Sequence, residues 1–346
     1  MLRTHKTQRF DKRNSFGYRD YVLVSLLPFL VSGSYMLNLM GSKERSIPFG
    51  HPSSVRTSCL APRQVYWDNY EIVDWCDNNQ AALENWIPCE QLERVQTDSN
   101  IILVQTNCGY LDFAMNLWRA YERLGRRNIL FLATDCQAYN MLSDLVGSVH
   151  VAKPLTSSAR VAKGAQSFNS TKYRQFTAIR PMIMMYFLHR GFNILWQDVD
   201  SIAIKDPFQF LPPQIPDLDV VLTNDSSNGK NPRDKQMCSC FVYVMANRRG
   251  SMWFLERWQK HTMEGQGLNQ PALNDALYDA LDQDLYGSAD FEHMILPVRM
   301  FPNGFTFPIY QSTAWWSHAN WRVGKPAKLE YFRNYSLWKA DDIICS

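Results

Sequence analysis

Short runs of apolar residues alternate with stretches of helical periodicity along most of this chain. The runs 101–105, 129–133 and 193–197 have the length and apolar content of buried strands. Residues 111–124 carry apolar side chains at helical spacing and end at Gly125, a residue type that commonly closes a helix. This alternation predicts an α/β fold with a mostly parallel sheet between helices. We expect further strands and helices at 219–223, 239–245, 252–261 and 270–281, and one helix over 173–187.

Composition and charge fit a globular protein that does not bind nucleic acid. Hydrophobic residues make up 46% and charged residues 20% of the 346 positions, which excludes a disordered or rod-like chain. The 36 Lys and Arg against 33 Asp and Glu give a net charge of +3. So weak an excess does not provide a basic surface for a nucleic-acid backbone.

The N-terminal segment predicts a membrane anchor. Residues 21–40 contain no charged side chain, and as a helix they would span about 30 Å, the thickness of a bilayer core. The preceding residues 1–20 are rich in Lys and Arg, which predicts a cytoplasmic tail and a translocated body. A signal peptide cleaved near Gly33 and a buried core helix are the alternatives.

Cysteines and glycosylation sequons agree with a lumenal body. Eight cysteines permit disulfides, although spacing alone does not define their pairing, and a cytosolic protein with reduced thiols is the alternative. Sequons begin at Asn169, Asn224 and Asn334. We therefore divide the chain into a tail and anchor, a stem with a helical lead-in over 41–99, and one main domain over 100–340.

Polar residues follow several of the predicted strands. In a parallel sheet, ligands bind outside the carboxyl ends of the strands. The residues at these positions are Thr106, Asn107, Asp135, Asp198, Asp200, Asn224 and Asp225.

The pair Asp198 and Asp200 is the strongest candidate for a metal site. If the backbone is extended there, both carboxylates lie on one face, where they suit Mg²⁺ or Mn²⁺ bridging to a diphosphate. Two other Asp-x-Asp triplets, at 217–219 and 282–284, lie away from a strand's carboxyl end. A solvated turn or a helix cap is the alternative interpretation of the pair.

A second group of candidate residues lies near the C-terminus. His318 is suited to complete a metal shell through a ring nitrogen, Gly324 allows close approach of a phosphate, and Lys325 adds a positive charge. A structural role is the alternative for His318. Cys238 and Cys240 lack the second cysteine pair of a zinc site, and we place both on a strand.

In their order along the chain, these motifs resemble the nucleotide-diphospho-sugar transferase family, which includes plant rhamnogalacturonan xylosyltransferases and extensin arabinosyltransferases. The resemblance covers residues 100–340. The matching segments are 106–113 (TNCGYLDF), 180–181 (RP), 191–207 (GFNILWQDVDSIAIKDP), 270–274 (QPALN), 301–304 (FPNG), 318–321 (HANW) and 324–325 (GK).

This resemblance implies a GT-A-like fold, that is, a single Rossmann-type mixed sheet flanked by helices. It also implies a divalent metal, Mn²⁺ or Mg²⁺, a nucleotide-sugar donor, a glycan or glycoprotein acceptor, retention of anomeric configuration, and a single-pass type II Golgi membrane protein. On the matched positions, Asp198, Asp200 and His318 would hold the metal, and Lys325 would contact the diphosphate.

The resemblance also implies roles for the remaining site residues. Thr106, Asn107 and Tyr110 would line the nucleotide pocket, beside Asp135. Arg180 would add positive charge near the leaving diphosphate. Near the start of their helix, Gln270, Asn274 and Asp275 would bind sugar hydroxyls during catalysis. The alternatives are a metal-dependent hydrolase or nucleotidyltransferase acting on diphosphates, and a lumenal binding protein without activity.

Overall fold

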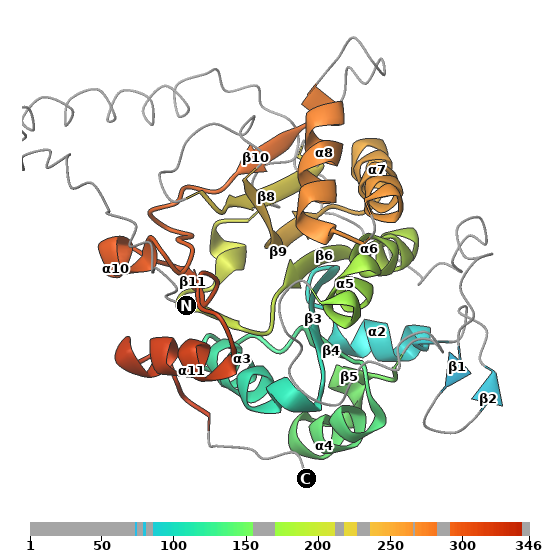
Figure 1. Ribbon diagram of the computed structural model, residues 1–346. Helices are drawn as coiled ribbons and strands as arrows, with labels where there is room; N and C mark the ends of the chain where they lie inside the picture. Colours follow the sequence, from blue (N-terminus) through green and yellow to red (C-terminus); the bar gives the residue numbers. More distant parts are fainter. Residues whose placement is uncertain are drawn as a thin grey trace, which may run out of the picture. The chain divides into compact units, whose positions relative to one another are not determined.

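The computed structural model describes residues 86–154, 170–211, 218–226, 236–265, 267–281 and 291–340, together with the backbone of β1 (Val73–Asp74) and β2 (Asn79–Gln80) (Figure 1). The predicted anchor at 21–40, the sequon asparagine Asn169, and Asp217 and Asp282 of the other two triplets lie outside these residues. Among the described helices, none combines the length and hydropathy needed to cross a bilayer.

One mixed sheet of seven strands forms the centre of the described domain. Its order is β10-β8-β9-β6-β3-β4-β5, and β9 runs antiparallel to both of its neighbours while the other described pairs are parallel. The strands are β3 (Asn100–Thr106), β4 (Ile129–Ala133), β5 (Val151–Ala152), β6 (Asn193–Gln197), β8 (Val220–Asn224), β9 (Met237–Val244) and β10 (His293–Ile295). The prediction of a mostly parallel α/β sheet is confirmed.

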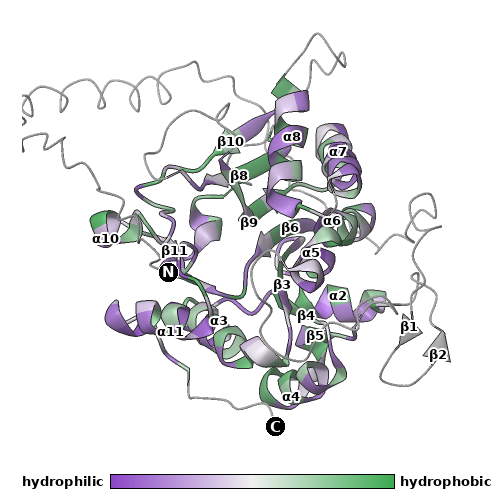
Figure 2. Cartoon of the chain, viewed as in Figure 1, coloured by the Kyte–Doolittle hydropathy of each residue, from purple (hydrophilic) through white to green (hydrophobic). Residues whose placement is uncertain are grey.

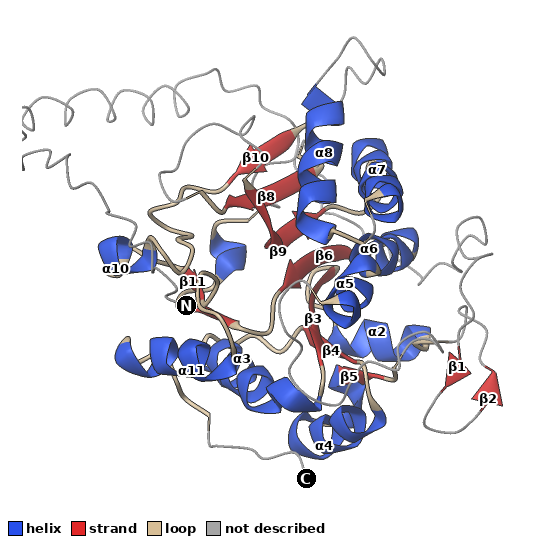
Figure 3. Cartoon of the chain, in the orientation of Figure 1, coloured by secondary structure: helices blue, strands red, loops and turns tan. Residues whose placement is uncertain are grey.

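Helices cover both faces of this sheet (Figure 3). The α-helices are α2 (Cys89–Val95), α3 (Leu111–Arg123), α4 (Cys136–Val146), α5 (Thr171–Ala178), α6 (Arg180–His189), α7 (Arg249–Glu264), α8 (Asn269–Leu281), α10 (Phe307–Tyr310) and α11 (Lys325–Asn334). Short 3₁₀ turns occupy Cys108–Tyr110, Ser148–His150 and Pro207–Gln209. A separate two-stranded ribbon pairs β7 (Ser201–Ala203) with β11 (Trp316–His318).

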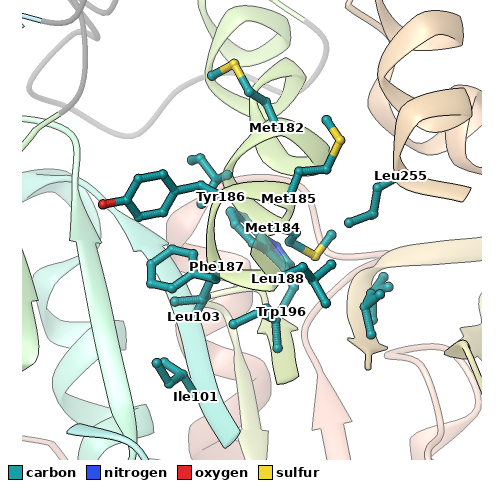
Figure 4. Close-up of a cluster of buried hydrophobic side chains, with 14 of the residues drawn as sticks. Ile101, Leu103, Met182, Met184, Met185, Tyr186, Phe187, Leu188, Trp196 and Leu255 are labelled. Atoms are coloured by element: carbon teal, nitrogen blue, oxygen red, sulfur yellow. The ribbon is translucent and has the colours of Figure 1, made fainter. Parts of the chain in front are cut away.

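Alternation along the strands divides the core into two layers. Ile101 and Leu103 of β3 pack with α2, α6, α7 and α8, whereas Ile102 and Val104 pack with α3 and α4. Figure 4 shows the first layer, in which Met185 and neighbouring α6 side chains lie over the sheet. In Figure 2, hydrophobic residues colour much of β4, β8 and β9, whereas α7 and α8 carry hydrophilic as well as hydrophobic residues, as expected for helices with one face on the core.

The helix predicted over 173–187 is two helices. α5 ends at Ala178 and α6 begins at Arg180, with Pro181 in the first turn of α6. Proline has no backbone N–H, so Pro181 cannot donate to the carbonyl of Thr177, and the helix is interrupted at Ile179. This break sets the orientation of Arg180, which the site uses.

Candidate active site

The paired carboxylates lie in a tight turn between β6 and β7. The backbone N–H of Ser201 donates to the carbonyl of Asp198 at 3.2 Å, so residues 198–200 are not in the extended conformation that the sequence suggested. The prediction that a shared strand face brings Asp198 and Asp200 together is therefore wrong in its geometry. They converge because the turn is closed by a hydrogen bond and because Asp198 N–H is anchored to the carbonyl of Cys240 at 2.9 Å.

The β7–β11 ribbon brings His318 to this turn. His318 pairs with Ser201 in antiparallel register, and Ala319 N–H donates to the carbonyl of Asp200 at 2.9 Å. The His318 Nε2 atom lies 3.2 Å from Asp200 Oδ1 and 3.9 Å from Asp198 Oδ2. Two segments more than a hundred residues apart thus form one three-residue cluster.

Two cations neutralise the carboxylates. Arg180 Nη2 lies 2.8 Å from Asp198 Oδ1, and its Nη1 donates to Ser239. Lys328 of α11 donates to Asp200 Oδ2. Burial would raise the pKa of the Asp200 carboxyl, but the charges of Lys328 and His318 outweigh it and hold that pKa well below its usual range. Burial in turn would lower the pKa of Lys328, but Asp200 raises it above its ordinary value.

Sequence reasoning proposed Lys325 and missed Lys328. Lys325 Nζ lies 2.9 Å from the buried carboxylate of Asp112 in α3, whereas Lys328, one helical turn further along α11, reaches Asp200. Gly324 precedes the helix with φ of 84°, a conformation that glycine adopts without strain. The signal that could have found Lys328 was the second lysine one turn after the first.

The donor atoms of Asp198, Asp200 and His318 fit a divalent cation. One ligand atom from each residue lies within 4.8 Å of the others. Two carboxylate oxygens and one imidazole nitrogen suit Mn²⁺ or Mg²⁺, which prefer hard oxygen ligands. The His318 Nδ1 atom is buried without a hydrogen-bond partner in the described part of the chain, and Nε2 faces the carboxylates.

The predicted site residues at the ends of β3 and β4 mostly stabilise the fold. Asp135 Oδ1 accepts from Ala138 N–H at 2.7 Å as the N-cap of α4, and its Oδ2 accepts from Cys108 N–H at 2.9 Å. Thr106 and Asn107 are buried at the end of β3. The contact between Asp135 and Cys108 ties the end of β4 to the end of β3.

Tyr110 lies closer to the charged cluster. Its ring packs edge-on against Phe113 at 5.3 Å, and burial raises the pKa of its hydroxyl, with smaller electrostatic effects from Lys328 and Asp200. The hydroxyl of Tyr110 therefore lies within the electrostatic influence of the charged cluster.

The predicted sugar-binding residues of α8 differ from one another in their contacts. Gln270 Nε2 donates to Asp225 Oδ2 at 3.0 Å, which ties the helix to the end of β8. Asn274 is buried and bonds both the N–H and the carbonyl of Met237, so its side chain is committed to holding β9. The predicted sugar contact of Asn274 is not compatible with this arrangement. Asp275 lies about 140° around the helix axis from Gln270 and is not on the same face.

Cys238 and Cys240 both lie on β9, as predicted, and are bonded to each other. Their sulfurs also lie within 4.8 Å of a His318 ring nitrogen. Metal ligation by cysteine requires a free thiolate, so the disulfide removes this pair as a zinc site.

Comparison with known proteins identifies the class. The chain matches the nucleotide-diphospho-sugar transferase family over residues 124–332, more than half of its length, and belongs to that family. It is a glycosyltransferase that depends on a nucleotide-sugar donor. The matched region contains Arg180, both site aspartates, Asp225, His318 and Lys328.

Individual relatives transfer different sugars. The chain is 26% identical to the UDP-D-xylose:L-fucose alpha-1,3-D-xylosyltransferase of Arabidopsis thaliana, over 93% of this chain and 87% of that protein. It is 23% identical to the UDP-galactose:fucoside alpha-3-galactosyltransferase of Dictyostelium discoideum, over 73% and 45%. It is 22% identical to the beta-arabinofuranosyltransferase RAY1 of Arabidopsis thaliana, over 93% and 64%.

Solved structures are more distant. Mouse xyloside xylosyltransferase 1 has a TM-score of 0.39 at 8% identity, covering 65% of this chain and 99% of that one. The galactosyltransferase LgtC, in complex with donor and acceptor sugar analogs, has a TM-score of 0.38 at 10% identity, covering 70% and 97%. The family assignment rests on the sequence matches.

Proposed function

We propose that this glycosyltransferase moves a sugar from a nucleotide-diphosphate donor to a fucose-containing acceptor glycan, with a divalent metal and with retention of anomeric configuration. The convergence of Asp198, Asp200 and His318 is the observation that carries the metal-dependent donor site. The acceptor follows from the relatives, because the xylosyl- and galactosyltransferases differ in donor and both have fucose or a fucoside in their names.

The charges of the site suit the departure of a diphosphate. Cleavage of the glycosidic bond to the donor leaves negative charge on the diphosphate oxygens, and preorganised positive groups lower the barrier. Lys328 and Arg180 are held next to the carboxylates and are positioned to stabilise that charge. A bound Mn²⁺ or Mg²⁺ would act as a Lewis acid on the diphosphate, held by Asp198, Asp200 and His318.

Burial adds to this effect. Asp200 is 6% and His318 4% exposed, so their electrostatic interactions are screened less than those at the surface. The acceptor hydroxyl would attack from the face that the diphosphate leaves, and a donor phosphate oxygen would take its proton. Tyr110, Thr106 and Asn107 are proposed to contact the nucleotide.

We also propose that the catalytic domain is lumenal, in a type II Golgi membrane protein anchored by residues 21–40. The charge-free stretch and its basic leader support this proposal. The chain should remain in membranes after carbonate extraction, with residues 46–346 protected from protease in sealed vesicles. A soluble product that begins near Ser34 would favour a cleaved signal peptide.

A donor and acceptor panel tests the activity. The purified protein would be incubated with UDP-xylose, UDP-galactose or UDP-arabinofuranose, with and without methyl L-fucoside, in Mn²⁺ or in EDTA. We expect metal-dependent transfer to the fucoside from one donor, with an α-linked product from an α-linked donor. If the donor is hydrolysed and no sugar is transferred even when the acceptor is present, the protein is a hydrolase. If the protein does not bind the nucleotide in the presence of Mn²⁺, an inactive binding protein is favoured.

A further inference from the structure

An exposed tryptophan near the candidate active site has a backbone conformation that is unusual for a bulky residue. Trp321 follows His318 by three residues and is 54% exposed. Its φ of 61° lies in the left-handed region, which costs a bulky side chain energy that the surrounding structure must supply. An exposed aromatic ring held in such a conformation contributes little to the core, which points to a role at the surface.

Hydrogen bonds to one half-buried carboxylate hold this tryptophan in place. Trp321 Nε1 donates to Asp225 Oδ1 at 3.2 Å, and Asn320 Nδ2 donates to the same oxygen. Gln270 Nε2 donates to Oδ2 at 3.0 Å. An ionised carboxylate accepts about four hydrogen bonds, so Asp225 retains capacity for a further hydroxyl donor. Three separate segments therefore meet at this carboxylate.

A second exposed aromatic ring lies next to Trp321. Phe305 is 50% exposed, and its ring centroid is 5.9 Å from that of Trp321 at an interplanar angle of 51°. The turn that carries Phe305 is fixed by Gly304, whose N–H donates to Asn320 Oδ1 at 2.6 Å. A Cβ on Gly304 would lie 2.2 Å from the carbonyl oxygen of Asn320, so only glycine allows this approach.

A buried asparagine connects the same turn to the Asp225 segment. Asn303 Oδ1 accepts from the N–H groups of Phe305 and Thr306, and its Nδ2 donates to the carbonyl of Ser226 at 3.2 Å. The two rings and the carboxylate are thus held rigidly relative to one another. Such preorganisation is typical of a binding site.

We propose that Trp321 and Phe305 form the platform on which the apolar face of the acceptor sugar packs, with Asp225 and Gln270 binding its hydroxyls, and that this platform selects a 6-deoxyhexose. The inference rests on the proposed function and specifies its acceptor site. The site begins three residues after His318, and a Cβ on Gly304 would lie 2.7 Å from the carbonyl oxygen of His318, so an acceptor here would lie next to the donor. A methyl group in place of a hydroxymethyl group adds apolar surface for the rings to cover and removes one hydroxyl that would need a partner.

The test compares methyl L-fucoside with methyl L-galactoside, which differ only in the 6-hydroxyl group. Trp321→Asn is the main variant, because asparagine tolerates a positive φ and preserves the turn while the ring is lost. We expect the KM for the fucoside to rise about tenfold, the KM for the donor to change by less than about threefold, and the preference for fucoside over galactoside to decrease. Trp321→Phe retains a ring and should recover most of the acceptor affinity.

A matched control and a binding measurement complete the experiment. Tyr278→Asn removes an aromatic ring of similar exposure from α8 and should leave both acceptor KM values unchanged. Saturation-transfer NMR on methyl L-fucoside reports binding without turnover, and its methyl signal should be strongest in the wild type and lost in Trp321→Asn.

The outcomes separate the two proposals. An unchanged acceptor KM, or unchanged discrimination between the sugars, in a Trp321→Asn protein that melts like the wild type would overturn the platform and leave the glycosyltransferase proposal intact. If the wild type transfers no sugar to the fucoside, the proposed fucose-containing acceptor is wrong. In that case methyl contacts that depend on Trp321 would still support the platform, and their absence would reject it.

Discussion

Replacing Asp200 by Asn removes one negative charge from the centre of the site while keeping the shape of the side chain. Asp200 contacts His318 at 3.2 Å and also contacts Lys328, and it is almost completely buried. If it holds a cation against a diphosphate, its loss weakens both metal binding and stabilisation of the leaving group. Removal of one electrostatic group from such a centre costs about 10²–10³ in rate, and we expect kcat to decrease by about 10² or more.

The same substitution should also lower stability, for a reason that can be separated from catalysis. It leaves the ammonium of Lys328, whose side chain is 19% exposed, without its counter-charge. Breaking one partner of a buried ion pair typically costs about 3–5 kcal/mol. Adding Lys328→Met removes the orphaned charge, so the double variant should recover most of the unfolding free energy and none of the activity.

The assay is turnover of the donor with Mn²⁺ titrated, together with urea unfolding of each variant in chelator. Asp198→Asn should be less severe than Asp200→Asn, because Asp198 is more exposed and lies further from His318. Asp144→Asn makes the same substitution at an exposed position on α4, away from the site, and serves as the control for replacing an aspartate by asparagine. Near-normal turnover and metal dependence in a folded Asp200→Asn protein would refute the site assignment.

Three further substitutions test separate parts of the structure. Gly304→Ala forces a Cβ against the carbonyl of Asn320, so we expect transfer to acceptor to fall at least tenfold and unfolding free energy to fall by about 1–3 kcal/mol; normal acceptor kinetics would contradict this. Lys325→Met leaves the buried Asp112 without its partner, and should lower stability by about 1–3 kcal/mol while changing donor KM little; a large donor KM effect would restore the original diphosphate role. Asn334 is exposed at the end of α11, and Asn334→Gln should abolish a mass shift on deglycosylation; an unchanged shift would place the glycan elsewhere.

Much of the sheet could be predicted because its strands are buried on both faces. The runs 129–133 and 193–197 correspond to β4 and β6 at both ends, because their apolar centres at 129–133 and 194–196 identify them as buried strands. The break between α5 and α6 was missed because apolar residues continue at helical spacing through Ile179. There the missing N–H of Pro181 interrupts the helix although the periodicity continues.

Site residues that belong to short sequence motifs could be predicted. Site residues that meet only through contacts between distant segments could not. Asp198, Asp200 and His318 belong to recognisable motifs, and the structure brings them together. Nothing near Asp225 in the sequence shows that Asn320 and Trp321, 95 and 96 residues away, donate to it. The contact between Lys328 and Asp200 likewise depends on how α11 packs against the rest of the domain.

The pairing of Lys328 with Asp200 has a consequence for metal binding. Arg180 and Lys328 together balance the charges of Asp198 and Asp200, so a dication that binds Asp200 must compete with an ammonium already in contact with it. Lys328→Met removes this competitor, and we expect the affinity for Mn²⁺ without donor to increase by about tenfold, because one like charge is withdrawn from the ligand shell. The same variant should raise the donor KM, since the diphosphate loses a cationic partner. Isothermal titration with Mn²⁺ measures the first effect and steady-state kinetics the second. Weaker Mn²⁺ binding in Lys328→Met would mean that the lysine supports the metal site instead of competing with the cation.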